Sequence, residues 1–284
     1  MTRESIYKTS DGHTAVRSYC EQQLAAWPRP HHSTVLETSL GPTHVVRSGS
    51  GRPVVVLPGT NFSAAVSLAL VDALSTDLEV HALDLPGQPG LSHDVRPPDV
   101  VGSYGRWMAE LLPQLTARPP LVIGHSLGGL VAMAGVAQGA EVAGLLLIDP
   151  AGLMRLRVTV PLLRATLGWL RTPEASTSEQ LLAKMMAAGA APDPALTDWM
   201  TLVGRHVRTS LAPRPMSDRD LAQLTGVATT VLNGRHDLFL PPRPLTRTVR
   251  SRLPAAEMVL ADHAGHLVPH ERPDAVRTVV TEAH

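Results

Sequence analysis

The chain has 284 residues, and its 25 basic and 25 acidic residues cancel in charge. This balance and the lack of any Lys/Arg block argue against a nucleic-acid partner. The opening residues lack the apolar run of a secretory signal, and no stretch approaches the ~18 to 20 apolar residues of a membrane span. A single cysteine, Cys20, cannot form an internal disulfide, so we expect a cytoplasmic location.

Apolar periodicity predicts an N-terminal helix that ends before Pro28. Beyond it, apolar segments of strand length alternate with amphipathic segments of helix length, which is typical of a mostly parallel sheet covered by helices on both faces. The expected strands are residues 34–37, 44–47, 53–57, 78–83, 120–124, 143–148, 228–232 and 256–261. The expected helices are residues 11–27, 100–115, 127–138, 244–252 and 273–281.

The alternation lapses in one long segment, where only helical stretches such as residues 161–170 and 178–188 lie between proline-rich turns. We interpret this segment as a helical cap inserted into a single α/β domain. The predicted organisation is an N-terminal helical extension over residues 1–32, a core over 33–150 and 226–284, and the cap over 151–225.

The strongest local signal is the pentapeptide Gly-His-Ser-Leu-Gly at residues 124–128, between a predicted strand and a predicted helix. Glycine on both sides removes Cβ atoms that would clash in so sharp a turn, and the turn presents the hydroxyl of Ser126. The structural alternative is a tight turn with a buried, inert serine. A catalytic serine needs a base to take its proton and an acid to orient the base.

Two aspartates and three histidines are candidates for these roles. Asp237 and Asp149 each follow an apolar strand, at the sheet edge where sites gather. We favour Asp237, because the Asp-Pro-Ala-Gly segment that begins at Asp149 also fits a turn into the cap. His263, His266 and His270 all follow the last predicted strand, and their residue type alone does not choose between them.

Taken together, these motifs resemble the α/β-hydrolase superfamily, in its branch of lidded lipase- and esterase-like serine hydrolases. The resemblance covers the chain from about residue 44 to its end. It is carried by Gly-His-Ser-Leu-Gly-Gly, by the Gly-Arg-His-Asp that ends at Asp237, and by Gly265-His266 with the Glu-Arg-Pro that follows. The resemblance implies Ser126 as nucleophile, Asp237 as acid and His266 as base, in the superfamily's chain order.

The resemblance also implies an oxyanion hole, a pair of N–H groups that stabilise the negative oxygen of the tetrahedral intermediate. One donor is the backbone N–H of Leu127, and the second is that of Thr60 with Asn61 as a helper. Many members of the superfamily have histidine where this chain has Pro58. Asp84 opens a loop similar to the superfamily's D-x-P-G-x-G-x-S with one extra residue, and we expect its carboxylate to anchor backbone N–H groups.

We expect a serine hydrolase that cleaves a carboxylic ester, lactone or thioester of a largely apolar small molecule, with no metal or organic cofactor. A carbon-carbon bond hydrolase, a perhydrolase and a biosynthetic acyltransferase or cyclase would use the same triad, and a non-catalytic ligand-binding protein on this fold is an alternative of another class. Candidate substrate-pocket residues are Asn61, Phe62, His125, Met154, Trp169, Trp199 and Leu267.

Overall fold

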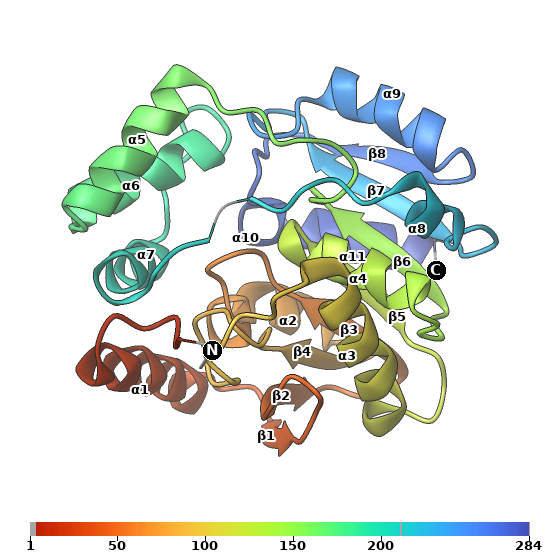
Figure 1. Cartoon of the computed structure of the whole chain (residues 1–284), viewed down its shortest axis with the longest axis horizontal. Helices are drawn as coiled ribbons and strands as arrows, with labels where there is room; N and C mark the ends of the chain where they lie inside the picture. Colours follow the sequence, from red (N-terminus) through yellow and green to blue (C-terminus); the bar gives the residue numbers. More distant parts are fainter. Residues whose placement is uncertain (1–3, 211, 284) are drawn as a thin grey trace.

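A computed structural model describes residues 4–210 and 212–283 (Figure 1). An eight-stranded sheet has the order β1-β2-β4-β3-β5-β6-β7-β8. β2 pairs antiparallel with both of its neighbours, and all the other neighbouring strands are parallel. The strands are β1 (His31–Leu36), β2 (Thr43–Ser48), β3 (Arg52–Leu57), β4 (Leu78–Leu83), β5 (Leu121–His125), β6 (Gly144–Ile148), β7 (Thr229–Gly234) and β8 (Glu257–Ala261). Every expected strand forms, and the predicted fold class is confirmed.

The five expected helices of the extension and core also form, with small shifts at their ends. They are α1 (Ser10–Ala26), α3 (Val100–Leu115), α4 (Leu127–Ala137), α9 (Pro242–Arg252) and α11 (Pro273–Ala283). Several short helices and α7 were not expected from the sequence. These are η1 (Ala64–Val66), α2 (Leu68–Leu74), α7 (Pro194–His206), α8 (Asp218–Ala222) and α10 (Val268–Glu271).

Helices α5 (Val160–Arg171), α6 (Ala175–Met185) and α7 fall within the predicted cap, and we call these three helices the cap. They pack against one another and lie to one side of the carboxyl ends of the parallel strands (Figure 1). α6 starts three residues before the predicted position because Glu174 and Thr177 form a reciprocal capping box at its N-terminus. α8 falls inside the predicted insertion, yet it packs on α4 and α9, so that part of residues 151–225 lies against the core.

Two apolar clusters fill the faces of the sheet. One packs α3, α4, α8 and α9 against one face, and the other packs α1, α2, α11 and the cap helices against the opposite face. α4 has ten buried residues because it is covered both by the sheet and by α3. Burial of this kind stabilises the inner parallel strands β3, β5, β6 and β7 despite their lack of apolar and polar alternation.

The N-terminal segment joins the cap to the core. Ile6 accepts from the amide of Arg208 and donates to the carbonyl of Asp94, each at 2.8 Å. Lys8 Nζ donates to the carbonyl of Gly204 at 2.8 Å, and Tyr19 Oη donates to that of Ala195 at 2.9 Å. This segment therefore fixes α7 to the body. β1 begins at His31, so the last residues of the predicted extension 1–32 belong to the sheet.

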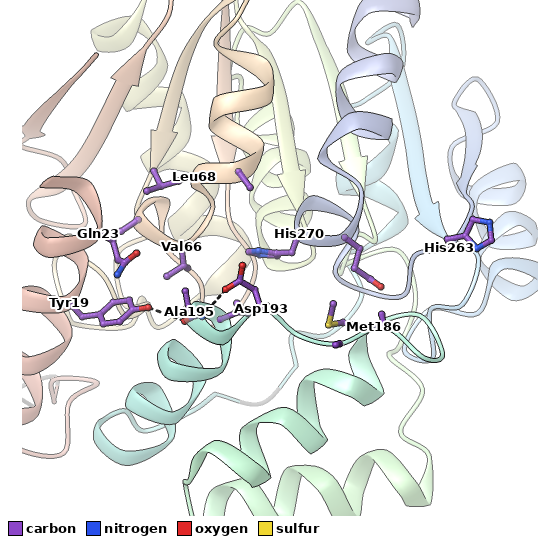
Figure 2. A pocket seen from close by; sticks show the side chains of 15 residues that line it. Tyr19, Gln23, Val66, Leu68, Met186, Asp193, Ala195, His263 and His270 are labelled. Atoms are coloured by element: carbon purple, nitrogen blue, oxygen red, sulfur yellow. Dashed lines mark hydrogen bonds between the residues drawn. The ribbon is translucent and has the colours of Figure 1, made fainter. Parts of the chain in front are cut away.

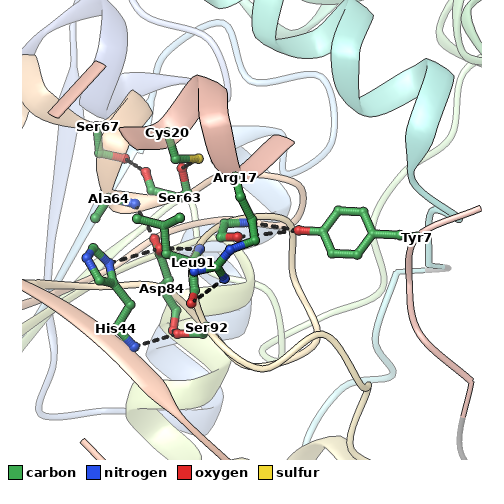
Figure 3. A network of polar contacts seen from close by, with 11 residues as sticks. Tyr7, Arg17, Cys20, His44, Ser63, Ala64, Ser67, Asp84, Leu91 and Ser92 are labelled. Atoms are coloured by element: carbon green, nitrogen blue, oxygen red, sulfur yellow. Dashed lines mark hydrogen bonds and ion pairs between the residues drawn. The ribbon is translucent and has the colours of Figure 1, made fainter. Parts of the chain in front are cut away.

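Asp84 anchors the loop that follows β4 (Figure 3). Its Oδ1 accepts from the amide of Ala64 at 2.7 Å, and its Oδ2 accepts from the amide of Leu91 at 2.8 Å and contacts His44 Nδ1 at 3.2 Å. Cys20 of α1 lies beside the same network, with its Sγ 3.8 Å from Ser63 Oγ. The carboxylate thus holds together the loop after β3, the loop after β4 and the start of β2, as expected from the sequence.

Candidate active site

Ser126 is the single residue between β5 and α4, and its backbone conformation is one that few residues adopt. Its φ is +49° and its ψ is −109°, and its amide donates to the carbonyl of Ile148 at 2.9 Å. A Cβ at Gly128 would lie 2.2 Å from the carbonyl oxygen of Leu57, so only glycine lets α4 start this close to β3. Packing around the turn therefore imposes strain of the kind that concentrates at functional sites.

His266 connects Ser126 with Asp237. His266 Nε2 lies 3.1 Å from Ser126 Oγ, and His266 Nδ1 lies 2.8 Å from Asp237 Oδ2. All three residues are buried. Burial opposes the charged form of His266, but the charge of Asp237 and its hydrogen bond outweigh burial, so the pKa of His266 is raised. Neither of the other two candidate histidines takes part in this series of hydrogen bonds. His263 is exposed, and the ring of His270 lies against that of Phe62 with ring centres 5.0 Å apart.

Asp237 is oriented by the turn that contains it. Its Oδ1 accepts from the amides of Phe239 at 2.7 Å and Leu240 at 3.1 Å, which leaves Oδ2 directed at His266. The Phe239 ring packs on the imidazole with ring centres 4.7 Å apart. The turn and the ring therefore fix the orientation of the Asp237 carboxyl group toward His266.

Asp149, the rival acid, lies next to this pair. One oxygen each from Asp149 and Asp237 and one ring nitrogen of His266 all lie within 4.8 Å of one another. Asp149 has a φ of +44°, its Oδ1 accepts from the amide of Gly234 at 2.8 Å, and its buried Oδ2 has no partner among the described residues. Burial, reinforced by the charge of Asp237, raises the pKa of Asp149 well above its usual range.

The two expected oxyanion donors lie beside the serine turn. Within residues 4–210 and 212–283, neither the Leu127 amide nor the Thr60 amide has a hydrogen-bond partner. A Cβ on Gly59 would lie 3.4 Å from Ser126 Cβ, which puts the loop before Thr60 in contact with the serine. The amide of Asn61, in contrast, donates to Gln88 Oε1 at 3.0 Å.

The Asn61 side chain contacts the segment after the cap instead of the serine. Asn61 Nδ2 donates to Thr209 Oγ1 at 3.3 Å, and the backbone carbonyl of Asn61 accepts from Trp199 Nε1 at 2.8 Å. Its Oδ1 is buried without a partner among the described residues. Through these contacts Asn61 joins the loop after β3 to α7.

The remaining pocket candidates lie in different parts of the structure. The side chain of Trp169 is buried between α5 and α7, where its Nε1 donates to the Met200 carbonyl at 2.9 Å. Met154 contacts α9, with its Sδ 3.9 Å from Thr248 Oγ1. Leu267 is fully buried next to the catalytic-histidine candidate.

Phe62 and His125 line a small internal cavity together with His270. His125 Nε2 donates to the carbonyl of His266 at 2.8 Å. Burial, with the nearby His266, lowers the pKa of His125 far below its ordinary range, so His125 is a neutral support for the loop that carries His266.

A larger pocket of about 590 Å³ opens between α1, α2, the cap and α10 (Figure 2). Tyr19 and Gln23 of α1 line one side, and Asp193 and Met186 of the cap line another. His270 lines both this pocket and the small cavity beside His125. Burial lowers the pKa of His270 to about 4, so the His270 side chain between the pocket and the small cavity is uncharged at neutral pH.

Glu271 links the cap to the histidine loop, a role not expected from the sequence. Glu271 Oε1 accepts from the amide of Ala187 at 2.7 Å, and its Oε2 accepts from that of Gly265 at 2.8 Å. The amide of His266 donates to the Met185 carbonyl at 2.6 Å. Glu271 stood in a motif that was quoted for the resemblance, but nothing in the sequence indicated which segment it would face.

A family comparison decides the identity of this fold. The alpha/beta hydrolase family model matches residues 54–279. The chain belongs to the α/β hydrolase family. This α/β hydrolase is similar to the uncharacterized carboxylesterase nap of Bacillus subtilis, with 30% identity over 134 residues. The aligned segment covers 45% of this chain and 44% of that relative, which is less than half of its length.

Solved structures resemble the α/β hydrolase over nearly its whole length. The naproxen esterase (carboxylesterase NP) of Bacillus subtilis has a TM-score of 0.82 at 23% identity, over 96% of this chain and 98% of that one. A putative hydrolase, also from Bacillus subtilis, has a TM-score of 0.84 at 22% identity, over 96% and 99% of the two chains. At these identities the likeness shows the fold.

Proposed function

We propose that the protein is a serine hydrolase that cleaves a carboxylic ester, lactone or thioester of a largely apolar small molecule, with Ser126 as nucleophile, His266 as base and Asp237 as acid. The main support is the hydrogen-bonded series from Ser126 Oγ through both ring nitrogens of His266 to Asp237 Oδ2. Relatives named as carboxylesterases support the choice of an ester substrate.

In the proposed reaction His266 Nε2 takes the proton from Ser126 Oγ as this oxygen attacks the substrate carbonyl carbon. The carbonyl π bond opens, and its oxygen becomes an anion that the amides of Leu127 and Thr60 stabilise by several kcal/mol. The intermediate collapses, the bond to the leaving group breaks, and His266 gives its proton to that group. Water, deprotonated by His266, then releases the acid and restores Ser126.

Asp237 holds the Nδ1–H tautomer of His266 and stabilises the imidazolium that forms in each half-reaction. The free amides of Leu127 and Thr60 support their role, because preorganised donors need no bond to break first. The proposed partner is a small molecule. The proposed location is the cytoplasm, which the buried free thiol of Cys20 supports.

The first test is intact-mass spectrometry after exposure to a fluorophosphonate probe. We expect one adduct per wild-type chain and none on Ser126→Ala, with strong slowing for His266→Ala. Ser75→Ala is the matched control: Ser75 is also buried, but it precedes β4 and so lies near the amino ends of the parallel strands. An unlabelled, folded wild-type protein would contradict the proposed nucleophile.

The second test distinguishes hydrolysis from acyl transfer and from a binding role. A panel of p-nitrophenyl esters of increasing acyl length is incubated in ¹⁸O-water, and the released acid is weighed by mass spectrometry. Hydrolysis through an acyl-enzyme incorporates one solvent oxygen per turnover. The probe could label Ser126 while no ester, lactone or thioester of the panels is turned over. That result would reject the hydrolase proposal, but Ser126 would still be an activated nucleophile.

A further inference from the structure

The outer face of α5 presents apolar side chains that nothing in the described chain covers. We define this outer face as Val158, Val160, Leu163, Leu167 and Leu170. These residues are between 39% and 64% exposed, and they account for five of the seven large apolar side chains that are exposed in the described chain. The spacing of the four within the helix puts them on one side, since residues three and four apart are neighbours on a helix surface.

The opposite side of α5 faces inward. Leu162 and Trp169 are buried there and pack in the cap. Figure 1 shows α5 at the periphery of the cap, away from the sheet. The helix is anchored at its start, where Thr159 caps it and the amide of Arg157 donates to the carbonyl of Phe239 at 2.8 Å. The outer face is therefore a fixed surface of a folded helix.

The charged residues of α5 and of the segment just before it all have one sign. Residues 150–173 contain four arginines and no lysine, aspartate or glutamate. All four arginines are exposed, and within the described residues none of them forms an ion pair; they are Arg155, Arg157, Arg164 and Arg171. On a helical projection of 100° per residue, Arg164 and Arg171 border the apolar stripe on one edge.

We propose that the outer face of α5 docks on an anionic lipid surface, with its apolar side chains in the headgroup boundary and its arginines on the lipid phosphates. A helix with an apolar face and cationic flanks is suited to lie in the plane of such an interface. A second copy of this chain fits less well, because the uncompensated arginines of the two copies would face each other. α5 has 12 residues, and no helix within the described parts of the chain has the length and apolarity to cross a bilayer.

Vesicle sedimentation tests this proposal on the full chain. The probes are vesicles of phosphatidylcholine alone and vesicles with equal parts of phosphatidylglycerol and phosphatidylcholine. We expect wild-type protein to sediment with the anionic vesicles and to bind the neutral ones much more weakly, with binding reduced at high salt. Binding to neither vesicle type would overturn the proposal.

Two variants separate the apolar and charged parts of the surface. The double variant Leu163→Ser with Leu167→Ser should weaken partition to anionic vesicles at least about tenfold. The double variant Arg164→Gln with Arg171→Gln should weaken it about 25-fold, because each arginine contributes about fivefold. Both pairs are exposed, so thermal unfolding should stay near that of the wild type. Leu238→Ser is the control for the leucines, since Leu238 is also 39% exposed but lies outside α5.

The control for the arginines is Arg247→Gln with Arg250→Gln on α9. These residues are exposed as well, but the apolar side chains Leu245 and Val249 of α9 are buried. We expect the α9 variant to keep most of the binding. An equal loss for both arginine pairs would mean attraction to the protein's charge in general and would refute a docking face on α5. Sedimentation velocity provides the last check. If the wild-type protein is a dimer and the variant Leu163→Ser with Leu167→Ser is a monomer, the outer face binds a second copy of this chain instead.

Discussion

Replacement of Asp149 by asparagine should stabilise the protein, and by more as the pH rises. Asp149 is fully buried, its Oδ2 has no partner among the described residues, and burial beside Asp237 raises its pKa. In the unfolded chain the same carboxyl ionises near its ordinary pKa of about 3.9. Between the two pKa values the unfolded state therefore binds fewer protons than the folded state. Stability due to this group is full below the unfolded pKa and falls as the pH rises.

The size of the effect follows from proton linkage. One proton that differs between the states changes the free energy of unfolding by up to about 1.4 kcal/mol per pH unit. Asparagine has no proton to lose, and its amide oxygen can still accept from the amide of Gly234 as Oδ1 of Asp149 does now. The stability gap between Asp149→Asn and the wild type should thus widen from about pH 4 upward and level off above the folded pKa of Asp149.

Urea unfolding followed by tryptophan fluorescence at intervals of one pH unit from 4 to 8 measures this gap. Asp198→Asn is the matched control, because Asp198 is exposed on α7, and its gap should stay flat. Asp149→Ala should be less stable than Asp149→Asn by about 1–3 kcal/mol, since it leaves the buried amide of Gly234 without an acceptor. A flat profile for Asp149→Asn would refute the inference that Asp149 holds a proton in the folded state.

Three further predictions concern the catalytic geometry. The acid limb of kcat/KM should lie above pH 6.5, because His266 must be neutral to act as a base and its pKa is raised; a limb below pH 6 in a titration with a p-nitrophenyl ester would contradict this. Gly128→Ala should destabilise the fold by about 3 kcal/mol or more, measured by urea unfolding, since its Cβ would meet the Leu57 carbonyl at 2.2 Å. Glu271→Gln can accept from only one of the two amides, so fluorophosphonate labelling should slow and hydrogen exchange should rise at whichever of Ala187 and Gly265 loses its acceptor; unchanged labelling and unchanged exchange at both would show that this link does not position the site.

The sheet was predictable because its strands carry their own signal. Buried parallel strands are continuous apolar runs, so residues 53–57 or 143–148 are recognisable without any knowledge of their neighbours. α2 has seven residues, too few to show a helical period. α7 has 13 residues and aspartate at its N-cap, but prolines at 192 and 194 give its start the composition of a proline-rich turn, although proline is also common in the first turn of a helix.

The candidate site could be assembled from sequence only where a residue's neighbours in the chain fix its position. Ser126 follows from the glycines on both sides, and the loops of Asp237 and His266 follow from the strands that precede them. The preference for Asp237 over Asp149 depended on turn composition, whereas the structure distinguishes them by partners from other parts of the chain: His266 Nδ1 for Asp237 and the amide of Gly234 for Asp149. The large pocket was not foreseen, because its walls come from α1, the cap and α10, and no local pattern records how these pack.

The contacts of the cap imply that its helices are not equally free to move. α7 is fixed to the core by the N-terminal segment, including the bond from Lys8 Nζ to Gly204. The end of α6 is instead bonded to the loop that carries the proposed base, through Met185 with His266 and through Ala187 with Glu271. Any opening of the cap at α6 must therefore break a hydrogen bond to the backbone of His266 itself. A displacement of the end of α6 would therefore also disturb the loop that positions the proposed base.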